Sequence, residues 1–238
     1  MSKIFSNEIE KLYDRLASKK PFAFSKYADG EWLAMKSYNA NPGDGEWKID
    51  NSDSRYQEAI DRLIKSFKYK HDDYYVGISC PCCQGDKHYD MVNFSEQNDD
   101  NLTFANIFVN SNYKFYVDNF INYFSNHTKI FLVANKVTNL ENLPFKVSKF
   151  YPIDYDAWIL NNDLIDIIKE DIDGESGILF LFSCGPFGNI LSQNLWDFNK
   201  ENQYIDVGST LDPWTKANRL KGKYYSGTSD LNKTCIWG

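Results

Sequence analysis

Two acidic side chains, two residues apart, are the first groups in the chain that could do chemistry. Asp29 and Glu31 flank Gly30 directly after residues 21–27, which read as a strand. Glycine permits a backbone turn that would aim both carboxylates at one point. Hard cations such as Mg²⁺ and Mn²⁺ take few protein carboxylates and complete their shell with phosphate oxygens and water. The segment therefore predicts a metal site for a nucleotide diphosphate, to which Lys26 adds positive charge.

The same tripeptide is also a common surface turn, and the chain contains a second copy for comparison. Residues 43–47 repeat Gly-Asp-Gly-Glu-Trp, but they follow Asn41 and Pro42 rather than an apolar strand. We therefore interpret Asp44 and Glu46 as a turn at the border of the cleft. The first copy remains the stronger metal candidate.

Two more polar segments follow predicted strands. At residues 183–189, Gly185, Gly188 and Asn189 form a strand-to-helix junction whose backbone N–H groups could approach an anion. This spacing is neither the dinucleotide fingerprint nor a P-loop, and a tight connection without a ligand is the alternative. Residues 206–212 place Asp206, Ser209 and Asp212 after the last strand, where an Asx or Ser/Thr turn is equally ordinary.

A cysteine-rich segment invites a zinc interpretation. Cys80, Cys82 and Cys83 are followed by His88, and thiolates and imidazole are the usual zinc ligands. The spacing differs from paired Cys-x-x-Cys knuckles, which disfavours zinc. A thiol nucleophile activated by His88 is also unsupported, since no residue is evident that would orient the base.

Charge and patterning exclude several classes of protein. The 238 residues include 33 acidic and 26 basic side chains, for a formal net charge of -7. That charge repels a polyanion unless the bases cluster, and no cluster is evident, so nucleic acid is not an expected partner. The first 20 residues do not resemble a secretory signal, and no stretch approaches the roughly 20 apolar residues of a transmembrane segment. We therefore expect a cytoplasmic protein with reduced cysteines.

The periodicity predicts the elements that must position these residues. Strands are expected at residues 21–27, 74–79, 129–134, 146–151, 177–183 and 203–207. Helices are expected at residues 7–19 with Ser6 as cap, 56–67, 102–124 with a break near Ser111, 155–172, and after residue 189; residues 80–101 read as a long functional loop. The nearly wholly apolar run 177–183 is typical of a strand covered on both faces. The alternation predicts an α/β, Rossmann-like, mostly parallel sheet with helices on both faces, forming one domain over residues 1–238 with the tail 213–238 packed on it.

Taken together, these segments resemble the GT-D-type glycosyltransferases, a family with a Rossmann-like fold and an Asp-x-Glu motif. The likeness begins at residues 24–35, which look like the family's Arg-Phe/Tyr-Gly-Asp-Gly-Glu segment, and recurs in order at residues 185–191 and 204–209. Lys26 stands where the family often has Arg, Ala28 where it often has Gly, and Ser209 where some members have His. Asn106 and Asn110 look like part of a further family segment on the cleft wall.

The resemblance implies a function for the first acidic pair. It implies transfer of a hexose from a nucleotide-sugar donor, UDP-linked, to a glycan or glycoconjugate acceptor, with Mn²⁺ or Mg²⁺ near Asp29 and Glu31. One alternative is a metal-dependent phosphoesterase or nucleotidase, although two-metal sites need more ligands than are evident here. Another is a non-catalytic nucleotide- or glycan-binding module that uses the many aromatic residues, 16% of the chain.

Overall fold

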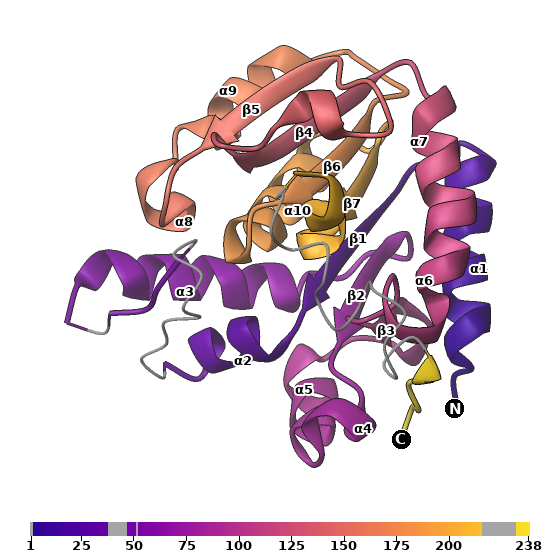
Figure 1. Cartoon of the computed structure of the whole chain (residues 1–238). Coiled ribbons are helices and arrows are strands. Elements are labelled where there is room, and N and C mark those ends of the chain that lie inside the picture. The colour runs from indigo at the N-terminus through magenta and orange to yellow at the C-terminus, as the bar shows by residue number, and fades with distance from the viewer. Residues whose placement is uncertain (1, 38–46, 51, 216–231) are drawn as a thin grey trace.

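A seven-stranded parallel sheet organises the chain (Figure 1). The structure, a computed structural model, describes residues 2–37, 47–50, 52–215 and 232–238. In these residues the strands run in the order β3-β2-β1-β7-β6-β4-β5, and all of their pairings are parallel. The strands are β1 (Phe22–Tyr27), β2 (Tyr74–Ile78), β3 (Leu102–Phe104), β4 (Ile130–Asn135), β5 (Lys149–Ile153), β6 (Leu179–Ser183) and β7 (Gln203–Asp206).

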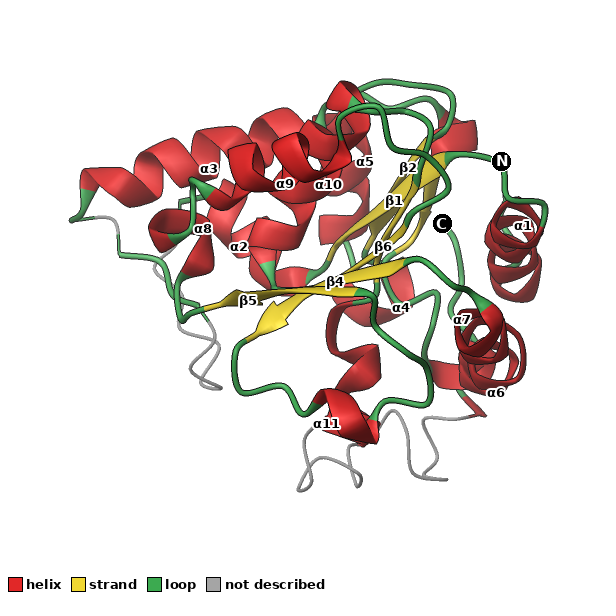
Figure 2. Cartoon of the chain, turned by 90° about the horizontal axis from the view of Figure 1, so that it is seen from above, coloured by secondary structure: helices red, strands yellow, loops and turns green. Residues whose placement is uncertain are grey.

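Helices connect the strands and cover both faces of the sheet. The α-helices are α1 (Phe5–Ala17), α2 (Asp29–Met35), α3 (Ser54–Phe67), α4 (Pro81–Gln84), α5 (Lys87–Ser95), α6 (Tyr113–Phe115), α7 (Asn122–Asn126), α8 (Ala157–Leu160), α9 (Leu164–Ile172), α10 (Pro186–Phe198) and α11 (Asp212–Thr215). Short 3-10 segments are η1 (Asp99–Asn101), η2 (Asn110–Asn112), η4 (Leu140–Asn142) and η5 (Gly208–Leu211), and η3 (Tyr116–Ile121) is a π-helical stretch. Figure 2 shows α3, α9 and α10 on one side of the sheet and α1, α6 and α7 on the other. The predicted α/β fold with a parallel sheet and helices on both faces is confirmed.

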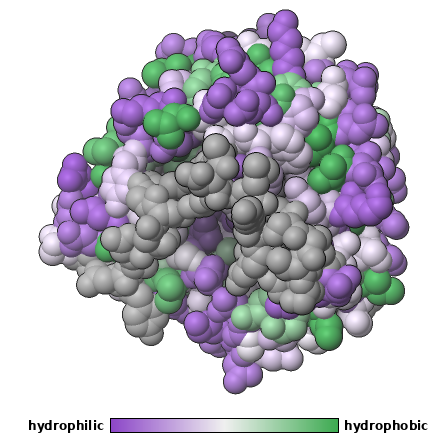
Figure 3. Space-filling model, viewed as in Figure 1, coloured by the Kyte–Doolittle hydropathy of each residue, from purple (hydrophilic) through white to green (hydrophobic). Residues whose placement is uncertain are grey.

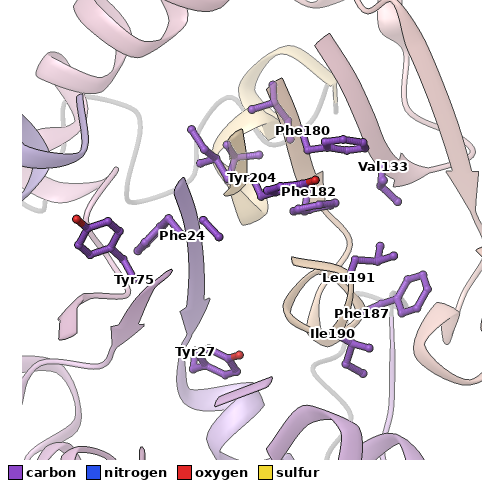
Figure 4. Packing of buried hydrophobic residues seen from close by; sticks show 14 of the residues in the cluster. Phe24, Tyr27, Tyr75, Val133, Phe180, Phe182, Phe187, Ile190, Leu191 and Tyr204 are labelled. Atoms are coloured by element: carbon purple, nitrogen blue, oxygen red, sulfur yellow. The ribbon is translucent and has the colours of Figure 1, made fainter. Parts of the chain in front are cut away.

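Aromatic packing forms much of the core between the sheet and α10. Phe180 on β6 stacks on Tyr204 of the neighbouring β7 with ring centroids 5.0 Å apart, and Phe182 also stacks on Tyr204 (Figure 4). From α10, Phe187 and Leu191 are fully buried against this layer. The nearly wholly apolar sequence of β6 follows from this burial on both faces.

The surface carries no predicted membrane element in the part of the chain that is described. None of its helices combines the length and the apolar character needed to cross a bilayer. On the face shown in Figure 3, hydrophobic side chains are scattered among hydrophilic ones. Scattered apolar side chains are normal on protein surfaces and mark no binding site by themselves.

Several predicted boundaries were wrong. The first helix begins at Phe5, so Ser6 lies inside its first turn and is not the cap. Residues 80–101 are not a long loop, because they contain α4, α5 and η1. Leu102 starts an edge strand rather than a helix, and α-helix begins only at Tyr113, after the 3-10 turn η2. The helix expected at 155–172 is divided into α8 and α9.

Only part of the predicted tail can be compared with the structure. Residues 216–231 lie outside the described residues, whereas α11 follows η5 directly. At the end of the chain, Ile236 forms an antiparallel bridge with Ile4, and Trp237 is buried. The last residues thus pack on the α1 side of the domain.

Candidate functional site

The topology places the carboxyl ends of β1 and β7 side by side, and we refer to the region at these two ends as the crevice. From β1 the chain continues to β2 and β3 on one side, and it then crosses to build the other half of the sheet, which ends with β7 beside β1. In an open parallel sheet, ligands bind at the carboxyl ends of the strands where the strand order reverses. Lys26, Asp29 and Glu31 lie at this end of β1, and Asp206 is the last residue of β7. The fold therefore brings together residues from two predicted segments.

Asp206 and Lys26 join the two strands. One Asp206 carboxylate oxygen accepts a hydrogen bond from the Lys26 backbone N–H at 3.3 Å, and the other accepts one from the Gly208 N–H at 3.0 Å. The Lys26 side chain passes directly over Gly208, where an added Cβ would lie 2.7 Å from Nζ and closer still to Cε. Gly208 has φ +52, so its conformation and its missing side chain both suit this approach.

The electrostatics show that four charged groups share this crevice. Burial raises the pKa of Asp206 to about 7, with the Lys26 charge opposing the rise and the Glu31 charge adding to it. Burial by itself would lower the pKa of Lys26, but the carboxylates of Asp206, Glu31 and Asp29 outweigh it and raise the pKa. Each acid therefore acts on the same ammonium group.

The two acids of the first motif occupy the first turn of α2. The Asp29 side chain is exposed, whereas Glu31 is only 7% exposed. One Glu31 carboxylate oxygen accepts a 2.9 Å hydrogen bond from the Ala28 N–H, which satisfies a donor at the start of the helix. This bond engages one oxygen of Glu31, and Asp29 presents its carboxylate to solvent.

The backbone turn expected at Gly30 does not occur, because Gly30 is helical. Its missing side chain makes room for Trp47, since a Cβ on Gly30 would lie 2.7 Å from the ring. The same ring lies against Gly185, where a Cβ would be 2.9 Å from it. Trp47 thus fills the space between the start of α2 and the start of α10. Asp44 and Glu46 lie outside the described residues.

The junction between β6 and α10 lies beside the crevice but is tightly packed. Gly185 precedes the helix with φ +55, and Pro186 occupies its first turn. Gly188 is buried, and a Cβ there would lie 3.2 Å from both the Cys184 sulfur and Phe182. Gly188 therefore serves close helix–strand packing, and a contact between Gly188 and substrate stays a prediction.

Asn189 ties α10 to β1. Its fully buried side-chain amide donates to the Ser25 hydroxyl at 2.9 Å and to the Lys26 carbonyl at 2.7 Å. These bonds hold the backbone of Lys26 at the mouth of the crevice. Its amide nitrogen is thus engaged within the protein, whereas its buried amide oxygen has no hydrogen-bond partner among the described residues, and a contact between Asn189 and substrate stays a prediction.

The segment after β7 turns over the crevice. Ser183 donates to the Gly208 carbonyl at 2.7 Å, and Thr210 shares a 2.9 Å hydrogen bond with Tyr116. Ser209 is exposed, whereas Asp212 is 3% exposed at the start of α11. Contacts of Ser209 and Asp212 with a substrate stay predictions.

Asn106 and Asn110 lie elsewhere, beyond β3. Their amides donate to sulfur atoms, Asn106 to Cys83 at 3.5 Å and Asn110 to Cys235 at 3.4 Å. Asn110 has φ +57 and is buried. Their assignment to the cleft wall stays a prediction, but their contacts are with the cysteines rather than with the acids.

Two grooves at the amino ends of the strands lie away from the acids. One is lined by Arg15, Pro21 and His71, and another by Lys19 and Gln203. These residues lie at or near the amino ends of the strands. Because ligands of such sheets bind at the carboxyl ends, the topology identifies the crevice between β1 and β7 as the candidate site.

Two sets of contacts in this region could not be predicted from the sequence. Trp47 lies against Gly30 and Gly185, and a second Trp after a Gly-Asp-Gly-Glu segment does not by itself indicate these contacts. The contact between Lys26 and Asp206 could not be predicted either, because nothing in a single sequence indicates that β7 lies beside β1. Only the strand order shows that the acids share Lys26.

No family model matches the chain, and no curated protein sequence matches it. Solved structures do resemble it. A selenomethionine-substituted structure of domain of unknown function 1792 aligns with a TM-score of 0.59 and 13% identity, over 94% of this chain and 86% of the other. A structure described as showing that this domain "has a distinct glycosyltransferase fold" aligns with a TM-score of 0.57 and 14% identity, over the same shares of the two chains. A structure described as a new glycosyltransferase from Streptococcus sanguinis aligns with a TM-score of 0.59 and 12% identity, over 97% and 92%. At this identity the likeness shows the fold alone, and the chain shares its fold with these three structures.

Proposed function

We propose that the chain is a metal-dependent glycosyltransferase that moves a hexose from a nucleotide sugar, UDP-linked, to a glycan or glycoconjugate acceptor. The observation that carries the proposal is the set of Lys26, Asp29, Glu31 and Asp206 at the crevice between β1 and β7. The fold shared with structures described as glycosyltransferases supports it. The donor, the metal and the acceptor are parts of the proposal.

The charge of the crevice argues for a cation. The carboxylates of Asp29, Glu31 and Asp206 all act on one ammonium group, that of Lys26, and Asp206, with a pKa of about 7, adds a partial negative charge near neutrality. The sum is negative, and a negative crevice repels a diphosphate. A divalent cation would reverse the sign, so metal and diphosphate would bind together.

The available donors fit Mn²⁺ or Mg²⁺. Asp29 offers an exposed carboxylate, and Glu31 has one oxygen that is not engaged by Ala28. Within the described ranges, these acids and Asp206 do not form a group of three ligand atoms converging on one point. That matches cations which take one or two carboxylates and obtain their remaining ligands from phosphate and water.

The four charged side chains of the crevice would have different roles in the reaction. When bound, the cation would neutralise the diphosphate that departs from the sugar. Asp29 and Glu31 hold the cation, and the Lys26 ammonium adds positive charge at the phosphates. Asp206 is a positioning residue, because both of its oxygens accept backbone N–H groups and it is only 4% exposed.

Two other functions would use the same crevice differently. A phosphoesterase or nucleotidase would need more metal ligands than the described acids provide. A non-catalytic module would bind nucleotide or glycan without needing the acids for affinity. No observation favours either of them.

Nucleotide release from a panel of sugar nucleotides tests the proposal. With UDP-glucose or UDP-galactose and Mn²⁺, we expect slow release of UDP even without an acceptor. Asp29→Asn and Glu31→Gln should abolish this release. Asp163→Asn, which changes an exposed acid before α9 with no capping bond, should leave it unchanged. Metal-dependent release of phosphate from simple nucleotides, with no release of UDP from sugar nucleotides, would overturn the proposal.

A further inference from the structure

The fold gathers four of the five cysteines at one point, away from the acids. Cys80, Cys82 and Cys83 lie at the start of α4, directly after β2, and Cys235 comes from the last residues of the chain. One sulfur from each lies within 4.8 Å of every other. Since 151 residues separate Cys83 from Cys235, this cluster is a product of the tertiary fold and not of local sequence.

The spacing of the sulfur atoms fits a single metal ion. Zinc binds thiolates at about 2.3 Å in tetrahedral geometry, which places the sulfur atoms about 3.8 Å apart. The longest sulfur–sulfur distance in the cluster, at most 4.8 Å, exceeds this value by no more than about 1 Å. The 3.1 Å contact between Cys80 and Cys82 would have to lengthen by less than about 1 Å. A four-iron cluster stands between its thiolates and would hold them farther apart.

Polar donors surround the cluster on two sides. The Lys233 ammonium donates to Cys83 at 3.3 Å. The amides of Asn106 and Asn110 point at Cys83 and Cys235, at 3.5 and 3.4 Å. Four thiolates around one divalent cation carry a net double negative charge, and N–H donors of this kind stabilise that charge.

The alternative roles of the cysteines are less consistent with this arrangement. Four reduced thiols packed together gain little as hydrophobic side chains, because Cys82 is exposed and Cys83 is half-buried. His88, the ligand considered from sequence, is not in the group, since its Nδ1 contacts the Ser79 carbonyl at 2.9 Å. The fourth ligand is instead Cys235.

We propose that Cys80, Cys82, Cys83 and Cys235 bind one Zn²⁺ as a structural site. All four positions are protein sulfur, the pattern of closed zinc sites. Binding replaces the thiol protons, which pass to solvent, and no electron is transferred. The ion would join the carboxyl end of β2 to the C-terminal segment, in which Ile236 already bridges to Ile4, the residue before α1. This inference is independent of the proposed glycosyl transfer.

Metal content of the full chain tests the site. Purified without chelator and under reducing conditions, the wild type should contain one zinc per chain by elemental mass spectrometry. Cys184→Ser, which changes the cysteine outside the cluster, should retain it. Cys82→Ala should lose it, and because Cys82 is exposed this variant is expected to remain folded, as circular dichroism would verify.

Two further measurements separate a metal site from other outcomes. Replacing zinc with Co²⁺ should produce the thiolate charge-transfer and tetrahedral d–d absorption bands, both absent in Cys82→Ala. Lys233→Met retains all four ligands and should weaken zinc binding about 10–100-fold in competition with a chromophoric chelator. A chain without metal whose four thiols alkylate equally with and without chelator, or whose mass shows disulfides, would overturn the proposal. Stoichiometric iron would overturn the assignment to zinc.

Discussion

Replacing Asp206 with asparagine should remove one specific pH dependence of stability. Asp206 is buried at the end of β7, beside Lys26 and near Glu31. Burial raises its pKa from the ordinary 3.8 to about 7. A carboxyl group whose pKa is raised by folding binds its proton more tightly in the native state, so its stabilising contribution is complete below about pH 4 and is lost as the pH rises through about 7.

The magnitude follows from the two pKa values. Their difference, about 3 pKa units at 1.36 kcal/mol each, corresponds to about 4 kcal/mol of unfolding free energy lost by the wild type between about pH 4 and pH 8. Asparagine does not titrate, so Asp206→Asn should not show this loss. It has one side-chain oxygen for the two N–H donors of Lys26 and Gly208, which costs about 1–3 kcal/mol at every pH.

Urea denaturation from pH 4 to pH 8 would measure this difference, with equal m-values as a check that both proteins unfold alike. We expect the stability advantage of the wild type over Asp206→Asn to fall by up to about 4 kcal/mol as the pH rises. Asp163→Asn, at an exposed position, should show a difference from wild type that does not change with pH. A pH-independent difference for Asp206→Asn would contradict the inference that burial raises the pKa of Asp206.

Two glycine substitutions test the packing around the site. Gly208→Ala should destabilise the protein more than Gly174→Ala in thermal or urea unfolding. Alanine at either position has a positive φ, which costs about 1–2 kcal/mol, but only at Gly208 does the new Cβ also displace Lys26. Equal losses of stability would contradict the contact between Lys26 and Gly208. Gly30→Ala should destabilise the wild type although alanine has the better helix propensity, because the new Cβ would meet the Trp47 ring. In a Trp47→Leu background the same change should be neutral or stabilising. A double-mutant cycle that shows no coupling between the two positions would contradict the packing of the Trp47 ring against Gly30.

The sequence predicts the strands at the centre of the sheet because buried strands consist mainly of apolar residues. β6 is apolar on both faces, and β1 ends where the acidic motif begins. β3 was missed because three residues at an edge are too few to show a period. The two short helices between Pro81 and Ser95 were also missed, since their face buries few apolar residues.

Parts of the site depend on contacts that no local pattern contains. The positions of Asp29 and Glu31 after β1 follow from the strand and its polar end. The pairing of Lys26 with Asp206 requires β7 to lie beside β1, which a single sequence does not show. The contact of Cys235 with the other three cysteines likewise depends on the tertiary fold. The spacing of Cys80, Cys82 and Cys83 does not indicate a zinc site, because the proposed fourth ligand lies far away in the sequence.

Titration of the wild type with UDP, with and without Mn²⁺, would show whether the acids at the carboxyl end of β1 hold a cation for the diphosphate. We expect Mn²⁺ to raise the affinity for UDP at least about tenfold and UDP to raise the affinity for Mn²⁺ by the same factor. The coupling should disappear in Asp29→Asn and Glu31→Gln and remain in Asp163→Asn. Equal affinity for UDP with and without Mn²⁺, or coupling unchanged when both acids are neutralised, would contradict the claim that the carboxylates at the mouth of β1 hold the cation.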